Sequence, residues 1–569
     1  MEKNQTVTGI AAALGTNGEG IVKGEGYTLF VPYLLPGERA KIKILRVKGN
    51  VAYGKAEEIF TPADERVRPE CSAFYRCGGC QLQHVKYRAQ LKFKSLLVQD
   101  SLRKIGGIEY PVPACERSEK EYGYRNKLQL PIGQKDGENA IGFYAERSHR
   151  IVEIDECPIH PKWSRELIAV LRRFMQTCGL DGYDEEQKTG QLRHIVVREL
   201  KGKFIVTLVS AVREIKGIDF LLHLLDDVFG EYTFYLNIND RDTNVVFGEE
   251  FILLKGQGVY DCTECGITFE AGANTFVQVN EGVRVKLYEK AVSLAVQSEE
   301  DTVIDCYAGG GLMTALFAKN CARAYGIEIV PEAVECGKVL AQRNDLADKM
   351  FPLCGRVEDL LPEMLKKEPN AVVVLDPPRA GVDRSLLKLL AQNDVKKVVM
   401  ISCNPATLAR DLGILTGTLK EDGGELVKSG NTDGAYQITY LQPYDMFPQT
   451  KHVETLVVLS HKKPDGHINI KVEFGEEEGQ VSLKEVAKRA EERKPKEKVT
   501  YKKMQDYIEQ TYGFKVHTAY IAEVKRDLGL PMYDAPNAVE ELKHPRPHPT
   551  PKMVEAIKET LKHFEILYN

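Results

Sequence analysis

The 569-residue chain has no apolar run long enough to cross a lipid bilayer, and its opening Met1–Gln5 has no apolar stretch of the kind found in secretory signals. It also has no excess of basic charge, because 77 Lys and Arg residues face 82 Asp and Glu residues and the net charge is −5. Internal repeats and long low-complexity tracts are absent as well. These absences predict a cytoplasmic protein without a membrane partner, in which any nucleic-acid-binding surface is local.

The cysteine content disfavours a disulfide framework. The 13 cysteines are odd in number and mostly scattered, whereas disulfide-stapled domains use even sets at regular spacings. We therefore expect reduced thiols and a metal site. The length of the chain also exceeds what one hydrophobic core organises, which predicts several domains.

Changes in pattern along the chain predict a multidomain protein with four parts. Short β-branched runs with glycine turns come first, and a region with one helix and several strands follows. Strands then alternate with helices and are almost continuously apolar, which predicts a doubly wound α/β domain. Charged and amphipathic helical segments come last. The expected domains are a small β-barrel over 1–62, a central α+β domain over 63–272, an α/β domain over 273–463 and a helical extension over 464–569.

Local patterns predict the main elements. A helical pattern covers 85–110. The predicted strands are 128–132, 140–144, 194–198 and 203–209 in the central domain, and 303–306, 324–328, 372–376 and 398–401 in the α/β domain. In the extension we expect an exposed helix or linker over 484–496, a helix around Met504–Ile508, one capped by Thr518 and ending at Gly529, and one starting at Thr550-Pro551.

In the predicted barrel, Lys41 and Lys43 alternate with Ile42 and Ile44. One lysine face is therefore expected on the outside of the barrel. The alternation fits a solvated sheet face and an RNA-facing one equally well.

Cys403 lies where a buried strand gives way to a helix, in the run Val398–Pro405. Asn404 is a good N-cap and Pro405 a good first helical residue. The positive end of the helix dipole is then expected to favour the thiolate over the thiol and to make Cys403 a nucleophile at neutral pH. A strand-end cysteine seen alone is more often an inert core residue, so this prediction depends on its surroundings.

Polar residues follow the strands of the α/β domain at the edge where such sheets bind ligands. The glycine run Gly309–Gly311 follows the first strand after Asp305 and opens a helix over Leu312–Ala318, and Glu328 ends the next strand. A glycine loop with a downstream acid is typical of sites for dinucleotides or S-adenosylmethionine. Contiguous glycines depart from the dinucleotide fingerprint, which favours the methyl donor, with a purely structural turn as the alternative.

The third strand leads into Asp376-Pro377-Pro378-Arg379. Amino-group methyltransferases place an aromatic residue after such a Pro-Pro pair to stack on the target base, so Arg379 indicates that the acceptor is not an exocyclic amine. Carbon C5 of a pyrimidine is a poor nucleophile unless another group adds first at C6. Cys403, one strand away, is suited to that addition.

Four separated motifs together resemble the RNA uridine-5-methyltransferase family. They are Phe276–Asn280, Asp376–Arg379, Ser402–Pro405 and Lys451–Thr455. The resemblance covers most of residues 6–460. At the front, Gly20–Ile59 resembles the TRAM RNA-binding barrel, which is OB-like and which the 23S rRNA branch of the family carries and the bacterial tRNA branch lacks. The resemblance implies a Rossmann-like methyltransferase domain behind a TRAM barrel and a central RNA-binding domain.

The resemblance also implies roles for single residues. The nucleophile would be Cys403, and the base that removes the C5 proton would be Glu454. Contacts to S-adenosylmethionine would come from Gln278, Tyr307, Glu328 and Asp376.

Cys71, Cys77 and Cys80, with the distant Cys157, resemble the four thiolates that hold a [4Fe-4S] cluster in the 23S rRNA branch. Three thiols within ten residues suit a cluster, and a fourth argues against the radical enzymes that cleave S-adenosylmethionine with three cysteines. Four thiolates suit zinc as well, and structural cysteines are a further alternative.

The expected function is S-adenosylmethionine-dependent C5 methylation of a uridine in 23S rRNA, by a monomer that binds no DNA. The uridine must lie in a loop or be flipped out, which costs on the order of a few kcal/mol. Expected RNA contacts are the TRAM barrel and Tyr124–Lys127 with Phe143, Tyr144, Arg147 and His149. One alternative is the same reaction on a tRNA loop, because archaeal-type relatives also carry the barrel and the cysteines. The other is an iron-sulfur oxidoreductase that uses a dinucleotide.

Overall fold

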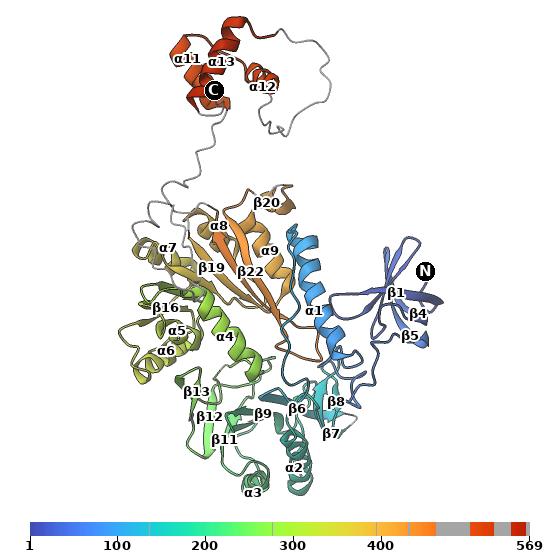
Figure 1. Ribbon diagram of the computed structural model, residues 1–569. Coiled ribbons are helices and arrows are strands. Elements are labelled where there is room, and N and C mark those ends of the chain that lie inside the picture. Colours follow the sequence, from blue (N-terminus) through green and yellow to red (C-terminus); the bar gives the residue numbers. More distant parts are fainter. Residues whose placement is uncertain are drawn as a thin grey trace, which may run out of the picture. The chain divides into compact units, whose positions relative to one another are not determined.

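The computed structural model describes residues 1–462 except 136, 276, 394 and 431–432, together with residues 501–528 and 548–564. The chain divides into two compact units, Met1–His467 and Ile468–Asn569 (Figure 1). The predictions for Phe276, for 484–496 and for the helix end at Gly529 lie outside the described residues. In the part of the chain that is described, no helix is long and apolar enough to cross a membrane.

The chain begins with a closed five-stranded barrel in the order β1-β2-β3-β5-β4. Its strands are β1 (Thr6–Leu14), β2 (Gly20–Gly24), β3 (Tyr27–Val31), β4 (Arg39–Lys48) and β5 (Val51–Thr61). Along β4 alternate residues face inward, so that Ile42 and Ile44 are buried and Lys41 and Lys43 are exposed. The predicted barrel and its lysine face are confirmed.

The central domain is a seven-stranded sheet in the order β12-β11-β10-β9-β6-β7-β8. It is preceded by α1 (Tyr87–Ser101) and a π-helical turn, η1 (Leu102–Gly106). The strands are β6 (Lys127–Lys135), β7 (Glu138–Tyr144), β8 (Ile151–Glu153), β9 (Leu192–Leu200), β10 (Lys203–Ser210), β11 (Tyr232–Ile238) and β12 (Glu250–Lys255). The helices α2 (Trp163–Cys178) and α3 (Ile218–Phe229) pack on it. The helix and the four strands predicted here are confirmed.

The α/β domain is a second seven-stranded sheet in the order β17-β16-β15-β18-β19-β23-β22. After the hairpin β13 (Tyr260–Glu264) and β14 (Ile267–Ala271), its elements are α4 (Glu281–Ala295), β15 (Thr302–Cys306), α5 (Leu312–Ala318), β16 (Arg323–Glu328), α6 (Pro331–Arg343), β17 (Met350–Cys354), α7 (Val357–Lys367), β18 (Val372–Leu375), α8 (Arg384–Gln392), β19 (Lys397–Ser402), α9 (Pro405–Thr416), β20 (Leu419–Asp422), β21 (Glu425–Lys428), β22 (Tyr436–Tyr444) and β23 (Glu454–His461). The first five strands of the sheet are parallel. β23 runs antiparallel to β19, and the edge strand β22 runs antiparallel to β23.

Both faces of this sheet are covered by helices, which explains the continuous apolar strands. Val303 and Val399 pack in the cluster that contains α4 and α5, whereas their neighbours Ile304 and Val398 pack in the cluster that contains α7, α8 and α9. α1 lies beside α9 on that second face (Figure 1). A helix of the central region therefore belongs to the core of the α/β domain.

In the second unit, three helices pack around a small core that includes Met504, Ile508, Ile521 and Ile557. They are α11 (Tyr501–Tyr512), α12 (Thr518–Asp527) and α13 (Pro551–His563). The predicted cap of α12 was wrong by one residue. His517 occupies the cap position and its Nδ1 accepts from the backbone of Ala519 at 3.2 Å, so Thr518 is the first helical residue.

Candidate active site and cysteine cavity

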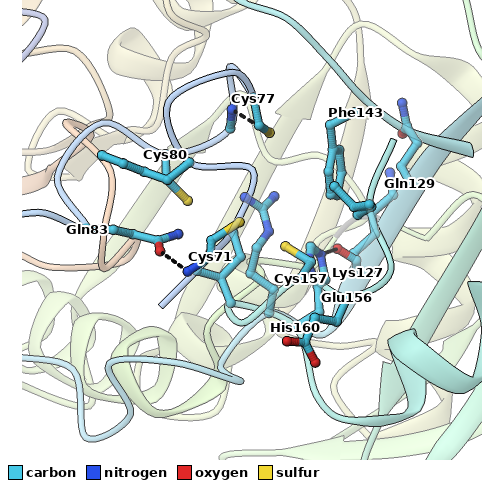
Figure 2. A pocket seen from close by; sticks show the side chains of 15 residues that line it. Cys71, Cys77, Cys80, Gln83, Lys127, Gln129, Phe143, Glu156, Cys157 and His160 are labelled. Atoms are coloured by element: carbon cyan, nitrogen blue, oxygen red, sulfur yellow. Dashed lines mark hydrogen bonds between the residues drawn. The ribbon is translucent and has the colours of Figure 1, made fainter. Parts of the chain in front are cut away.

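The central domain holds a cavity of about 320 Å³ that is lined by Cys71, Cys77, Cys80 and Cys157. The first three belong to the segment between the barrel and α1, and the fourth to the loop between β8 and α2. Figure 2 shows their sulfur atoms around one space. Among the described residues, no three His, Cys, Asp or Glu side chains form a group that could hold a metal ion. The structure thus gathers the four thiols around one space without forming, in the described chain, a group of metal-ligand geometry.

The cavity wall combines apolar side chains such as Phe74 and Ile159 with Arg125, Lys127 and His160. Two of its buried nitrogen atoms, Arg125 Nε and His160 Nδ1, have no hydrogen-bond partner in the described chain. Buried polar atoms are nearly always paired, and an exception is expected where a group outside the protein completes the site. The four thiols and the two nitrogen atoms therefore fit a site that a bound group completes.

Gly78 lets the cysteine segment approach the central sheet closely. Its N–H donates to the carbonyl oxygen of Tyr144 at 3.0 Å. A Cβ atom at this position would lie 3.0 Å from the nitrogen of Glu146 and 3.1 Å from the Tyr144 oxygen. Only glycine fits this approach without a backbone shift.

Several residues expected on an RNA surface are buried instead. The Tyr124 hydroxyl donates to the carbonyl oxygen of Pro448 at 3.0 Å, and Asn126 exposes 9% of its surface. Phe143 stacks on His160 with 6.0 Å between ring centroids. The prediction was wrong for Tyr124 and Asn126, because a mixture of cations and aromatics in the sequence does not reveal which side chains face the core.

The carboxyl edge of the α/β sheet carries most of the other predicted residues. Tyr307 follows β15, Glu328 ends β16, Asp376 follows β18 and Cys403 follows β19. These strands are parallel neighbours, so their ends meet at one edge. Gln278 lies in the loop that precedes α4.

The glycine loop is fixed by Glu328. The carboxylate of Glu328 accepts from the N–H of Gly309 and from that of Val330, each at 2.9 Å. Gly311 has a φ of +83°, and a Cβ atom there would lie 2.7 Å from the Met350 side chain. The positive φ therefore favours glycine at this position, and the hydrogen bonds to Glu328 hold the loop.

A buried ion pair holds the Gln278 loop and was missed by the sequence analysis. Arg284 and Glu264 each expose 1% of their side chains and are 2.7 Å apart, and Arg284 Nη1 donates to the Gln278 carbonyl oxygen at 2.5 Å. Arg284 lies on the apolar stripe of α4 with Leu287 and Tyr288. A charge on that stripe was the available signal, because buried arginines require a partner.

Cys403 and Glu454 are brought together by strand pairing. β19 and β23 are antiparallel with Ser402 opposite Thr455, so the next residues in register are Cys403 and Glu454. Glu454 exposes only 3% of its surface, so its side chain points into the fold. As predicted, Asn404 caps α9, its side chain accepting from the Ala406 N–H at 3.1 Å.

The predicted effect on the thiol was wrong in direction. Burial raises the pKa of Cys403, the carboxylates of Glu454 and Asp376 raise it further, and only Arg379 lowers it among the neighbouring charges. Burial is the largest of these causes, and the two acidic neighbours add to it. In the free protein the thiol is protonated at neutral pH, and a proton acceptor is needed to activate it.

Two carboxylates near the thiol titrate around neutral pH. Burial raises the pKa of Glu454 to about 8, with Asp376 adding to the shift and Arg379 opposing it, and burial raises the pKa of Asp376 itself to about 7. Such shifts are typical of groups that exchange protons in catalysis.

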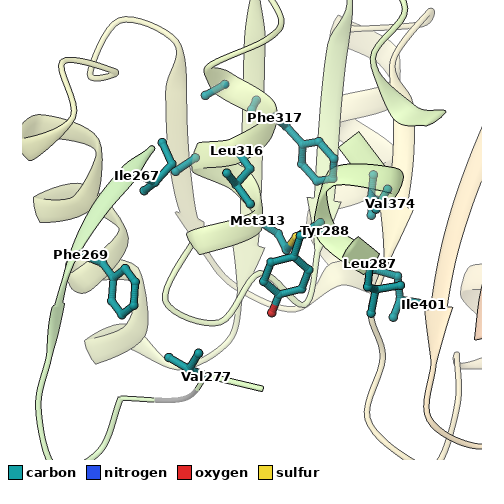
Figure 3. Packing of buried hydrophobic residues seen from close by; sticks show 14 of the residues in the cluster. Ile267, Phe269, Val277, Leu287, Tyr288, Met313, Leu316, Phe317, Val374 and Ile401 are labelled. Atoms are coloured by element: carbon teal, nitrogen blue, oxygen red, sulfur yellow. The ribbon is translucent and has the colours of Figure 1, made fainter. Parts of the chain in front are cut away.

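Two further residues complete this buried group. Burial also raises the pKa of Asp305 to about 7, against the effect of a 2.6 Å hydrogen bond from Thr314. The Tyr288 hydroxyl has its pKa raised by burial and by the charge of Asp376. Figure 3 shows the Tyr288 ring beside Met313. The Tyr288 hydroxyl points toward the side on which Val277 lies. Tyr288 was missed by the sequence analysis because it continues the apolar stripe of α4.

Replacing Arg379 with glutamine is expected to move the rising limb of the pH–rate profile to higher pH. Arg379 lowers the pKa of both Cys403 and Glu454, so its removal raises both and leaves a smaller fraction deprotonated at neutral pH. The rate should fall about tenfold near pH 7 and recover toward about pH 10. Rates measured over this range test the effect. Arg379→Lys, which keeps the charge, is the control, and an unshifted limb in Arg379→Gln contradicts the electrostatic role.

Comparison with known families identifies similar sequences in three parts of the chain. Residues 361–462 match the family of tRNA (Uracil-5-)-methyltransferases, and residues 5–56 match the TRAM domain. Residues 300–400 match the family of RNA cap guanine-N2 methyltransferases. The TRAM match coincides with the five-stranded barrel, and the first match contains Cys403 and Glu454.

Individual relatives are similar over most of the chain. An "Uncharacterized RNA methyltransferase" of Clostridium tetani is 37% identical over 465 residues, which are 81% of this chain and 97% of the relative. One of Halalkalibacterium halodurans is 38% identical over 468 residues, 81% and 98% of the two chains. The crystal structure of Pyrococcus abyssi tRNA (uracil-54, C5)-methyltransferase in complex with S-adenosyl-L-homocysteine is 27% identical, with a TM-score of 0.61 over 79% of this chain and 99% of that one.

Proposed function

Because this chain belongs to the RNA uracil-5-methyltransferase family, we propose that it methylates C5 of a uridine in 23S rRNA with S-adenosylmethionine as donor. The observation that carries the proposal is the juxtaposition of a thiol and a buried carboxyl, Cys403 and Glu454, across β19 and β23. A thiol suits addition to C6 of uracil, and a carboxylate of raised pKa suits removal of the C5 proton.

The reaction proceeds in three balanced steps. The Cys403 thiolate forms a bond to C6, and the electrons of the C5–C6 double bond move onto the ring as an enolate. Carbon C5 then attacks the sulfonium methyl group, whose bond to sulfur breaks and leaves S-adenosylhomocysteine. Glu454 takes the C5 proton, the electron pair reforms the C5–C6 double bond, and the thiolate leaves.

The buried carboxyl groups take part in different proton transfers. Before addition the Cys403 thiol is protonated, because burial and the nearby carboxylates raise its pKa. We assign Asp376, whose pKa burial raises to about 7, as the group that accepts the thiol proton and returns it when the thiol leaves. We assign Glu454 as the group that later holds the C5 proton, since its pKa of about 8 makes the protonated form stable at neutral pH. Arg379 keeps a cation beside both groups and favours their charged forms.

The donor is assigned to the edge formed by the ends of β15, β16 and β18. Glu328 remains able to accept a ribose hydroxyl while its oxygens hold the glycine loop, since each carboxylate oxygen has two lone pairs. Tyr307, Asp376 and Gln278 are proposed as the further contacts, which places the methyl group near Cys403.

A tRNA loop is the second candidate substrate, and a specific observation favours it. The solved Pyrococcus abyssi enzyme, which aligns over 99% of its length, is named as a tRNA (uracil-54, C5)-methyltransferase. The barrel itself does not separate the two substrates. The family assignment argues against the dinucleotide-dependent oxidoreductase.

Mapping 5-methyluridine in total RNA from wild-type and deletion strains tests the proposed function. Loss of one modified position in 23S rRNA, restored by the intact gene, is the expected result. Loss of 5-methyluridine at a tRNA position instead supports tRNA as the substrate. If neither RNA loses 5-methyluridine, the proposed function is wrong.

We also propose that Cys71, Cys77, Cys80 and Cys157 hold a [4Fe-4S] cluster. Four thiols around a cavity of about 320 Å³ support this assignment, and zinc, which four thiolates also suit, is the alternative. When bound, the cluster would tie the cysteine segment to the central domain. No step of the methyl transfer requires it.

Protein purified without oxygen is therefore expected to contain about four irons and four sulfides per chain. Cys80→Ser should lower the iron content severalfold and lower the temperature of unfolding, because a structural link is lost. Metal analysis and thermal unfolding measure both effects. Cys262→Ser, which changes a buried thiol of β13 outside the cavity, is the control. One zinc per chain in place of iron contradicts the assignment.

A further inference from the structure

The loop that delivers Glu454 is buried, which is unusual for a connection between two strands. Residues 445–453 join β22 to β23, and within this loop Asp445, Met446, Gln449 and Thr450 expose 2% of their surface or less. A buried loop has to pair its polar groups with other parts of the fold. The partners of this loop therefore identify what holds the carboxyl group in place.

Gln449 makes the largest number of these contacts. Its carbonyl oxygen accepts from the backbone N–H groups of Gln81 at 3.2 Å and Leu82 at 2.9 Å. Its side-chain oxygen accepts from Gln90 Nε2 at 2.9 Å, and its own N–H donates to Gln90 Oε1 at 3.0 Å. Both its backbone and its side chain thus bind segments more than three hundred residues earlier in the sequence.

The backbone of Gln449 lies in the left-handed region with a φ of +69°. Non-glycine residues rarely adopt this conformation, and they keep it only where the surrounding contacts impose it. At Gln449 the reciprocal pair with Gln90 and the two N–H groups of the cysteine segment supply those contacts. An observed outlier three residues from His452 and five from Glu454 points to a role in the geometry of the loop.

We propose that Gln449 is a positioning residue, which clamps the loop 445–453 to α1 and to the cysteine segment so that Glu454 faces Cys403. The inference rests on the proposed role of Glu454 as the base that removes the C5 proton. Gln449 touches neither substrate nor donor in this account and acts only through the loop.

Contacts on both sides of Gln449 support the clamp. Lys94 of α1 and Asp445 form an ion pair with no exposed side-chain surface, and Lys94 Nζ also donates to the carbonyl oxygen of Phe447 at 2.9 Å. Further along, Lys451 Nζ donates to Asn17 Oδ1 in the barrel at 2.6 Å. The loop is therefore held at its start, middle and end, and Gln449 forms the middle contact.

The proposal predicts a defect in one step of the reaction. Without the Gln449 side chain the loop loses one of its two hydrogen bonds to Gln90. Glu454 is then held less accurately near the C5 proton. Misplacing a catalytic group by about 1 Å costs about a hundredfold in the step it serves. Addition of Cys403 to C6 and binding of S-adenosylmethionine do not use Glu454 in this way and should keep their wild-type values.

The test measures turnover together with the fraction of RNA covalently bound to the enzyme on a denaturing gel. Gln449→Ala should turn over about tenfold to a hundredfold more slowly and should accumulate the covalent adduct at unchanged donor affinity. Gln449→Asn, which keeps an amide and tolerates positive φ, should recover part of the rate. Gln191→Ala, which removes a side-chain bond to the Asp181 N–H in the central domain, is the matched control and should leave the ratio of adduct to turnover unchanged.

Glu454→Gln is measured alongside as a reference, because it removes the base directly. Accumulation of adduct in both variants supports the proposal. Accumulation in Glu454→Gln with wild-type behaviour in Gln449→Ala overturns the positioning role alone. A parallel loss of adduct formation and turnover in Gln449→Ala also overturns it, since that is the signature of a general structural defect. If Glu454→Gln itself accumulates no adduct, the base assignment fails and the positioning role with it. Should Gln449→Ala not fold, Gln449→Asn decides by the same ratio.

Discussion

Cys403→Ala is expected to lose RNA methylation by about 10⁴-fold or more, the size of effect found when a covalent nucleophile is removed. Without the sulfur no bond forms at C6, and C5 of an intact uracil ring does not attack a sulfonium methyl group. Transfer of labelled methyl groups to RNA measures the loss. The fold should survive, because Cys403 is only partly buried at the end of β19 and its neighbour Asn404 still caps α9.

RNA carrying 5-fluorouridine supplies the decisive control for this first prediction. Wild-type enzyme should form a stable adduct with it, because fluorine at C5 cannot leave as a proton does. Cys403→Ala should form none, and Cys336→Ala, which removes an exposed thiol of α6, should behave as wild type. Methylation at the wild-type rate by Cys403→Ala would end the nucleophile assignment.

Glu454→Gln is expected to slow turnover by about 10²-fold to 10⁴-fold and to stall the reaction after methyl transfer. The amide accepts no proton from C5, so the methylated base remains bound to Cys403. Mass spectrometry of the adduct should find the added methyl group. Adduct formation itself should persist, because the nucleophile and the donor site are intact.

The matched control is Glu363→Gln, in which an exposed carboxylate of α7 that pairs with Lys366 is lost. This variant should leave the rate of turnover and the rate of adduct formation unchanged. An adduct that lacks the methyl group would show instead that Glu454 acts before methyl transfer, as the group that activates the thiol. Turnover equal to that of wild type would remove it from the reaction.

Features set by neighbouring residues could be predicted from the sequence. The helix over Leu312–Ala318 has the same bounds in the structure as in the prediction. Asn404 caps α9, also as predicted. The alternation of Lys41 and Ile42 is equally local, since successive side chains of a strand face opposite sides. In each case the chain within a few residues determines the outcome.

Features set by distant segments could not be predicted. The pKa of Cys403 depends on Glu454 and Asp376, which approach it only through the pairing of β19 with β23 and β18. Tyr124 is buried because its hydroxyl meets Pro448, far away in the chain. Gln449 gives no sign of a positive φ, because glutamine is not a residue type that favours one.

The position of β23 affects the order in which a ribosome completes the enzyme. β15, β16 and β18, whose ends form the proposed donor edge, are all synthesised before Asp376. β19 follows with its thiol, but its antiparallel neighbour β23 ends at His461 and emerges later. A nascent chain can therefore build the donor edge and expose the thiol before the carboxyl partner exists. The proposed base is therefore the last of these side chains to be synthesised.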